Sequence, residues 1–305
     1  MTERPAAGTA VTADDHELAG ELAGQAGRLL LAVRDEVGFG DARALKDTGD
    51  LRAHEYLMGE LAGRRPGDAV LSEEGRASVA GKSATAVAME GPPTANTDEA
   101  LRLAASRVWI VDPLDGTREF AEEGRGDWAV HVALWDGARG ALGAGAVALP
   151  AQGVTLRTTP QGAVSASLKD GSEEPLRMAP PAPGGLRIAV SRSRPPEFVG
   201  RLAERLADDG IAVEPVPIGS AGAKIAAVLL GEVDAYVHAG GQYEWDSAAP
   251  VAVALAAGAH ASRIDGSALT YNREDPRLPD ILVCHPGSAS TLLTVIREVT
   301  GGPPG

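Results

Sequence analysis

The most informative stretch of the chain reads Trp109-Ile110-Val111-Asp112-Pro113-Leu114-Asp115-Gly116-Thr117-Arg118-Glu119-Phe120. Its first residues continue an apolar strand, which we place over Val108–Val111. Two carboxylates and a Gly-Thr turn follow this strand. The proline between the acids fixes its own φ angle and removes a backbone donor. Gly116 allows the backbone to approach a ligand closely. The spacing therefore predicts that Asp112 and Asp115 converge on one site at the strand end.

Two explanations of this acidic turn have to be weighed. Asp-Pro and Asp-Gly are common turn dipeptides that close loops without any catalytic purpose. However, two carboxylates beside a buried strand are poorly solvated and repel each other unless a cation neutralises them. Carboxylate and carbonyl oxygens are the ligands that Mg²⁺ prefers, together with water and substrate phosphate. We therefore interpret the segment as a metal site suited to phosphate hydrolysis.

Composition excludes several other classes of protein. The 305 residues include 28 basic and 42 acidic side chains, and the net charge of −14 argues against binding nucleic acids or anionic membranes through bulk charge. The hydrophobic content of 44% is sufficient for a packed core. Cys284 is the single cysteine, which excludes an intrachain disulfide and a cysteine-rich zinc site. With no leader and no apolar run of membrane length, we expect a cytoplasmic protein.

The hydrophobic pattern divides the chain into two halves. After a lead-in over residues 1–13 that we expect to be disordered, residues 14–183 are predicted to form an α+β half. Within it, residues 76–106 have little periodicity and are predicted to be a loop insertion. Residues 184–305 alternate strands and helices, which is typical of an α/β layer with a largely parallel sheet. The two halves together are expected to form one active-site cleft.

Individual elements follow from the spacing of apolar residues. Helical spacing over Leu18–Val33 predicts a long amphipathic helix, and a second helix is predicted to begin just after Asp50. A short strand over Ala69–Leu71 leads into Glu73 and Glu74. Further strands are predicted over Trp128–Trp135, Ala144–Leu149, Val154–Thr158, Leu186–Val190, Ile211–Val216 and Ala235–His238, and further helices over Phe198–Ala207, Ala221–Leu230 and Ala248–Ala257.

A third acidic signal is the stretch Glu244-Trp245-Asp246-Ser247, which follows a predicted strand of the second half. Ligands of α/β sheets gather at the carboxyl ends of strands. Asp246 is predicted to open a helix, where it could serve only as the N-cap. The exposed N–H groups of the same helix start would also suit a phosphate. The residues alone leave both roles open.

These motifs, in this order, resemble the inositol monophosphatase superfamily of magnesium-dependent, lithium-sensitive phosphatases. The resemblance runs from about Asp14 to Val299, and it implies a layered αβαβα sandwich of the inositol monophosphatase and fructose-1,6-bisphosphatase type. The stretch Asp-Gly-Thr-Arg-Glu-Phe is similar to that of the CysQ branch, the 3′(2′),5′-bisphosphate nucleotidases. Residues 124–131, 218–224 and 238–246 also resemble segments of actinobacterial CysQ proteins.

The resemblance implies roles for single residues. It implies that two or three Mg²⁺ ions are held by Glu73, Asp112, the Leu114 carbonyl, Asp115 and Asp246. Mn²⁺ accepts the same oxygen ligands. Thr117 and Asp50, with Glu73, are expected to orient and deprotonate the attacking water. Asp47 is an alternative to Asp50, because the segment before Asp50 is shorter than the usual approach in the family.

The expected reaction removes the 3′-phosphate of 3′-phosphoadenosine 5′-phosphate, giving AMP and phosphate, and links the protein to sulfate assimilation. Paired divalent ions can activate water for direct in-line attack, neutralise the phosphoryl oxygens and stabilise the leaving group. The residues predicted to bind the phosphates or the nucleotide are Gly116, Thr117, Ser191, Arg192, Ser193, Arg194, Ser220 and Lys224.

The alternative function keeps this mechanism and acts on inositol or sugar phosphates such as fructose 1,6-bisphosphate. Ala239 disfavours it, because inositol monophosphatases usually have an inositol-binding acid near this position. Homodimers are frequent in the superfamily.

Overall fold

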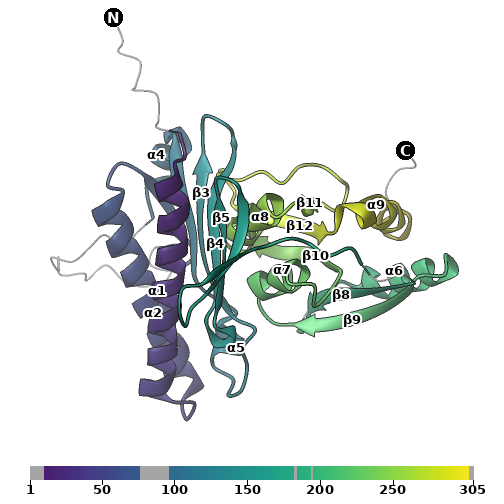
Figure 1. Cartoon of the computed structure of the whole chain (residues 1–305), viewed down its shortest axis with the longest axis horizontal. Coiled ribbons are helices and arrows are strands. Elements are labelled where there is room, and N and C mark those ends of the chain that lie inside the picture. Colours follow the sequence, from purple (N-terminus) through teal and green to yellow (C-terminus); the bar gives the residue numbers. More distant parts are fainter. Residues whose placement is uncertain (1–9, 76–95, 182–183, 194, 302–305) are drawn as a thin grey trace, which may run out of the picture.

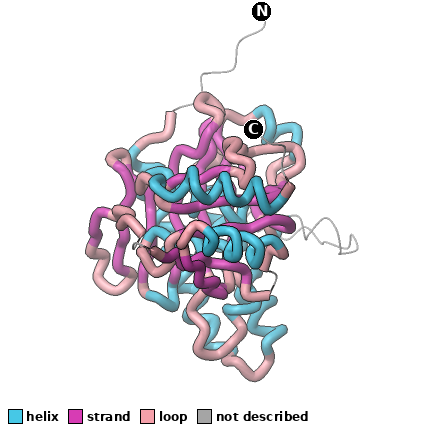
Figure 2. Tube along the Cα trace, turned by 90° about the vertical axis from the view of Figure 1, so that its right-hand side faces the viewer, coloured by secondary structure: helices cyan, strands magenta, loops and turns pink. Residues whose placement is uncertain are grey.

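The computed structural model describes residues 10–75, 96–181, 184–193 and 195–301. Its elements stack in alternating layers of helices and sheets (Figure 1). The layers contain, in order, α1 (Ala13–Val37) and α2 (Ala42–Arg64); a seven-stranded sheet; α7 (Ala221–Leu229) and α8 (Glu244–Ala256); a five-stranded sheet; and α6 (Phe198–Asp208) and α9 (Pro286–Thr300). Figure 2 shows the last of these layers from outside, with helices lying across strands. The αβαβα architecture expected from the sequence is confirmed.

The first sheet has the strand order β1 to β7. Its strands are β1 (Ala69–Ser72), β2 (Arg107–Asp115), β3 (Ala129–Asp136), β4 (Ala141–Leu149), β5 (Val154–Thr159), β6 (Gly162–Ser167) and β7 (Glu173–Pro175). Only β1 and β2 pair in parallel, with Ser72 opposite Val111, and the other neighbours are antiparallel. The carboxyl ends of β1 and β2 therefore lie at the same edge, which brings Glu73 beside Asp112.

The second sheet has the order β11-β12-β10-β8-β9. Its strands are β8 (Gly185–Ser191), β9 (Ala212–Ile218), β10 (Ala235–Tyr243), β11 (His260–Ser262) and β12 (Arg277–Cys284). The predicted parallel pairing holds for β10-β8-β9. β11 and β12 were not predicted; β12 pairs antiparallel with both β10 and β11, so only part of this sheet is parallel.

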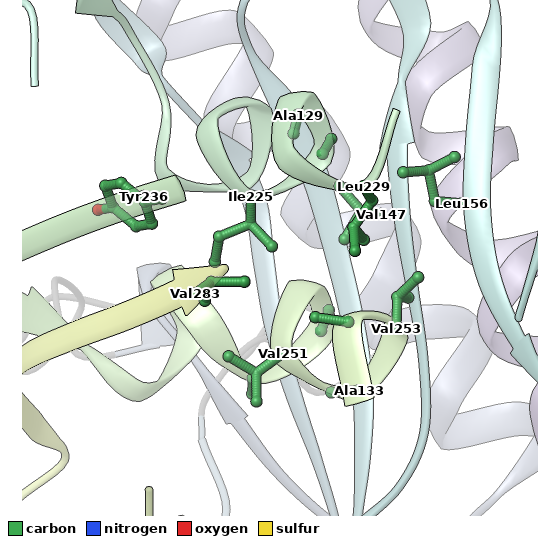
Figure 3. Close-up of a cluster of buried hydrophobic side chains, with 14 of the residues drawn as sticks. Ala129, Ala133, Val147, Leu156, Ile225, Leu229, Tyr236, Val251, Val253 and Val283 are labelled. Carbon is green, nitrogen blue, oxygen red and sulfur yellow. The ribbon is translucent and has the colours of Figure 1, made fainter. Parts of the chain in front are cut away.

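Apolar side chains fill each space between layers. The middle cluster joins the two sheets: Val147 of β4 and Val283 of β12 belong to it together with Ile225 of α7 and Val253 of α8 (Figure 3). All four side chains are at most 1% exposed. The helices α7 and α8 therefore fix how the two sheets sit relative to each other, and with them the site at their junction.

Some predicted boundaries were wrong. α2 begins at Ala42 rather than after Asp50, because the Asp41 side chain caps the N–H groups of Arg43 and Ala44. Gly49 lies inside α2, where a Cβ would come within 2.7 Å of the Phe120 ring.

Two other differences concern the predicted loops and termini. Part of the predicted loop insertion is a helix, α4 (Glu99–Ala104). Residues 76–95 of the insertion and residues 1–9 of the lead-in lie outside the described residues. Among the described helices, none combines the length and apolar character that a membrane span requires.

A buried ion network ties the start of α1 to the first sheet. The Arg107 guanidinium donates to Asp15 at 2.7 and 3.1 Å and to Asp68 at 2.9 and 3.0 Å. Burial alone would raise the pKa of Asp15, but hydrogen bonds from Arg107 and Thr12 lower it to about 2. This carboxylate therefore stabilises the fold at neutral pH.

We predict that Arg107→Leu lowers the free energy of unfolding by about 3–5 kcal/mol, since it leaves the Asp15 charge buried without its main partner. Urea denaturation at pH 7 measures the change. In the wild type, the contribution of Asp15 is complete above its unfolded pKa near 3.8 and is lost as the pH falls through about 2. A loss below about 1 kcal/mol for the variant, the range of an exposed pair, would contradict this account.

Candidate active site

The acidic cluster is built by strand pairing at the edge of the first sheet. Glu73 directly follows β1, and its backbone N–H donates to the Val111 carbonyl at 3.4 Å. The β2–β3 pairing is irregular between Asp112 and Asp115. A bulge of this kind re-aims side chains that would otherwise alternate between faces. Oxygens of Asp112, Asp115 and Asp246 consequently lie within 4.8 Å of one another.

Asp112 is held rigidly and only half satisfied. Its side chain is almost fully buried, and one oxygen, Oδ1, accepts the Leu114 N–H at 3.0 Å. Within the part of the chain that the structure describes, the other oxygen, Oδ2, has no hydrogen-bond partner. A buried carboxylate oxygen without a donor is costly. A bound cation would satisfy it.

The other two carboxylates are oriented by the second half of the chain. Asp115 Oδ2 accepts the Gly222 N–H at 2.6 Å and lies 3.3 Å from His131 Nε2. Asp246 Oδ2 accepts the Tyr243 N–H at 2.7 Å. α8 begins at Glu244, so Asp246 lies in its first turn and is not the N-cap, which was one of the two roles that the sequence left open. Both halves of the chain supply groups that aim these oxygens.

The charges of the cluster are not balanced within it. Burial raises the pKa of Glu73 to about 7, and the charges of Glu74, Asp115 and Asp50 act in the same direction. Burial likewise raises the pKa values of Asp112 and Asp246 well above their usual range. The donor set consists of carboxylate oxygens, which suits a hard divalent cation. The residues therefore fit a metal ion.

The structure distinguishes the two candidate acids on α2. Asp50 is half-buried, and burial followed by the charge of Glu74 raises its pKa to about 7. Asp47 is exposed and forms an ion pair with Arg43 at 3.7 Å. The fold thus brings Asp50, and not Asp47, toward the acidic cluster.

The Gly-Thr turn forms one wall of the site. Gly116 has a φ of +86°, and a Cβ there would lie 2.8 Å from the Ser220 Cβ, so this position needs glycine. Thr117 begins the short helix α5 (Thr117–Phe120). Its hydroxyl donates to the Leu114 carbonyl at 3.2 Å, so Thr117 and the predicted carbonyl ligand lie side by side.

An open cleft adjoins the cluster. The predicted residues that line it are Asp115, Gly116, Thr117, Ser191, Ser193, Ser220, Lys224 and Asp246. Lining residues that the sequence analysis did not assign to substrate include Arg118, Glu119, Tyr236, His238 and Gln242. His238, at the end of the strand predicted over Ala235–His238, is largely buried and still lines the cleft.

Ser220 and Lys224 shape the cleft from the start of α7. The Ser220 hydroxyl caps this helix by accepting the Ala223 N–H at 2.9 Å. The Lys224 ammonium is buried over the Tyr236 ring, and it donates to the carbonyls of Gly219 at 2.6 Å and Ser220 at 2.9 Å. Burial lowers the pKa of Lys224. Lys224 thus lines the cleft, and two of its N–H donors hold the Gly219–Ser220 backbone in place.

Arg192 and Arg194 were both predicted to contact the substrate. Arg192 does not line the cleft, and its guanidinium is bonded to the carboxylates of Glu119 and Glu122. This arrangement does not support its predicted contact with a substrate phosphate, since the two carboxylates already use four of its five N–H donors. Arg194 lies outside the described residues.

Gly222 is a site residue that the sequence analysis missed. A Cβ at this position would lie 2.0 Å from His131 Nε2, so only glycine lets α7 approach β3 closely enough to donate to Asp115. The signal in the sequence is the second glycine of the Gly-Ser-Ala-Gly-Ala-Lys stretch over residues 219–224. A glycine inside a predicted helix indicates close backbone packing.

The chain is thus a five-layer sandwich with clustered carboxylates at the junction of its sheets. The model of the inositol monophosphatase family matches residues 19–299, and the chain belongs to that family. It is 48% identical over 295 residues to the 3′-phosphoadenosine 5′-phosphate phosphatase of Mycobacterium leprae, covering 93% of this chain and 94% of the relative. It is 29% identical to the 3′(2′),5′-bisphosphate nucleotidase CysQ of Escherichia coli, covering 82% and 91%.

A solved structure agrees with these relatives. The structure of CysQ from Bacteroides thetaiotaomicron matches with a TM-score of 0.71 and 27% identity, covering 90% of this chain and 97% of that one. The CysQ-type assignment made from the sequence motifs is confirmed, and with it the class of enzyme, a phosphatase.

We predict that Asp112→Asn abolishes stabilisation by metal. Mg²⁺ should raise the Tm of the wild type, because the ion binds only the folded cluster. Without metal, the variant should melt at the same or a higher temperature than the wild type, since a neutral amide removes one repelling acid. Thermal melts with Mg²⁺ and with chelator measure both effects. An equal Mg²⁺-induced shift in wild type and variant would contradict the placement of the metal at Asp112.

Proposed function

We propose that the chain is a Mg²⁺-dependent phosphatase that removes the 3′-phosphate of 3′-phosphoadenosine 5′-phosphate to give AMP, and that it thereby serves sulfate assimilation. The observation that carries the proposal is the orphaned, buried Oδ2 of Asp112 among converging carboxylates beside an open cleft. The substrate is supported by the names of the relatives at 48% and 29% identity.

The roles of single residues follow from their positions. Glu73, Asp112, Asp115, Asp246 and the Leu114 carbonyl would hold two or three ions. Such ions lower the pKa of water and neutralise phosphoryl oxygens. The Thr117 hydroxyl and the Glu73 carboxylate would orient the attacking water for in-line attack, and Asp50 would accept its proton. Gly116 and Thr117 would place their backbone N–H groups against the phosphate.

The proposal also assigns a site for the nucleoside and an alternative metal ion. The leaving nucleoside would occupy the cleft lined by Ser191, Ser193, Ser220 and Lys224. Mn²⁺ would replace Mg²⁺, because it accepts the same ligands. The cytoplasmic location and the homodimer stay predictions.

The direct test is phosphate release from 3′-phosphoadenosine 5′-phosphate, inositol 1-phosphate and fructose 1,6-bisphosphate in parallel, with Mg²⁺ and with chelator. We expect the highest kcat/KM for the nucleotide and no release with chelator. A higher kcat/KM for inositol 1-phosphate or fructose 1,6-bisphosphate would keep the mechanism and overturn the substrate. Release that survives the chelator would overturn the mechanism.

Asp50 and Asp47 provide a matched pair of variants on one helix. Asp50→Asn should lower kcat by roughly 10²–10⁴-fold, the range expected when a proton acceptor is lost. Asp47→Asn should leave kcat unchanged, because Asp47 is exposed and pairs with Arg43 on its own helix. Steady-state kinetics at saturating Mg²⁺ compares them. A larger loss of kcat in Asp47→Asn than in Asp50→Asn would make Asp47 the proton acceptor.

A further inference from the structure

A polar seam joins the two halves of the chain along the cleft. Arg192 follows the end of β8 in the second half, whereas Glu119 and Glu122 belong to the segment around α5 in the first half. Arg192 donates to Glu119 Oε1 through Nε at 3.2 Å and Nη2 at 2.7 Å. It donates to Glu122 through Nη1 at 3.0 Å and Nη2 at 2.8 Å. One guanidinium thus engages two carboxylates across the seam.

The carboxylate side of this seam is itself held firmly. Arg34 of α1 donates to the backbone carbonyls of Phe120 at 2.8 Å, Glu119 at 3.0 Å and Glu122 at 3.3 Å. Its guanidinium also lies 4.9 Å from the centre of the Trp128 ring. Glu119 is 7% exposed, so its carboxylate has little freedom to turn to solvent. The segment 119–122 is therefore a fixed support to which Arg192 is attached.

The other side of the seam carries part of the cleft wall. Ser191 and Ser193 flank Arg192 in the chain, and both line the cleft although Arg192 does not. The Arg192 N–H donates to the Ile218 carbonyl at 3.2 Å, which ties the segment to the end of β9. A second contact between the two halves lies nearby: Asp127 of the first half accepts the N–H of Gly219, which follows β9, at 2.7 Å.

We propose that Arg192 is a positioning residue that pins the segment carrying Ser191 and Ser193 to Glu119 and Glu122, and so sets the shape of the cleft. It does not act as the ligand of a second substrate phosphate. A phosphate ligand would need free donors, whereas four of the five N–H donors of Arg192 already serve two carboxylates of the protein. The choice of substrates for its test rests on the proposed function.

The test compares kcat/KM for 3′-phosphoadenosine 5′-phosphate and for adenosine 3′-monophosphate, which lacks the 5′-phosphate. Arg192→Ala should lower kcat/KM for both by a similar factor, roughly 10-fold, because a displaced wall affects either substrate. The double variant Glu119→Gln/Glu122→Gln should show the same loss. Adding Arg192→Ala to it should cost little more, since the same contact is already gone.

Two results would show instead that Arg192 binds the substrate phosphate. One is a loss of kcat/KM in Arg192→Ala that is confined to the bisphosphate. The other is a lower KM for the bisphosphate in the Glu119→Gln/Glu122→Gln variant, in which Arg192 is released. Arg205→Ala is the matched control, because it breaks ion pairs with Glu298 and Asp209 on the outer face of the same half. It should change kcat/KM by less than about two-fold, as expected for exposed pairs.

Amide hydrogen exchange provides a readout that does not need turnover. Arg192→Ala should speed exchange in residues 185–193 of the metal-loaded protein, whereas a residue that only binds phosphate would leave this exchange unchanged. If the wild type releases no phosphate from either nucleotide, the proposed substrate is wrong. The exchange measurement then decides by itself: faster exchange in the Arg192→Ala variant supports the positioning role, and unchanged exchange contradicts it.

Discussion

The convergence of buried carboxylates at the junction of the two sheets is the constraint from which the rest of the site follows. Oxygens of Asp112, Asp115 and Asp246 lie within 4.8 Å of one another, and burial raises the pKa values of Asp112 and Asp246. Lys224, the buried cation of the cleft, already donates to the carbonyls of Gly219 and Ser220. Such a cluster costs folding free energy unless a divalent ion completes it.

The fold supports this arrangement with a few specific devices. The parallel β1–β2 pair places Glu73 beside Asp112, and the irregularity in β2 brings Asp115 to the same side. The N–H of Gly222 then orients Asp115 from the second half of the chain. Because the shared core around α7 and α8 fixes both sheets, the cluster can be rigid although its members are far apart in sequence.

Much of this arrangement could be predicted from the sequence, because it rests on local patterns. The apolar run before Asp112 predicted a strand, and the acids after three separate strands predicted a metal site. Contacts between distant segments could not be predicted. The carboxylates that hold Arg192 lie 70 and 73 residues before it in the chain, so no local pattern indicated them and Arg192 was predicted to contact the substrate. The start of α2 was also missed: the helix begins at Ala42, where the Asp41 side chain caps it, and Gly49 inside it makes room for Phe120.

The central claim is that the carboxylates at the sheet junction hold the metal ions. The most direct measurement is a crystal structure of the protein soaked with Mn²⁺, in which anomalous scattering locates the ions without assumptions about their ligands. The account predicts anomalous peaks within bonding distance of Asp112 Oδ2 and of the carboxylates of Asp115 and Asp246. Ions bound only elsewhere on the protein, with this cluster empty, would contradict it.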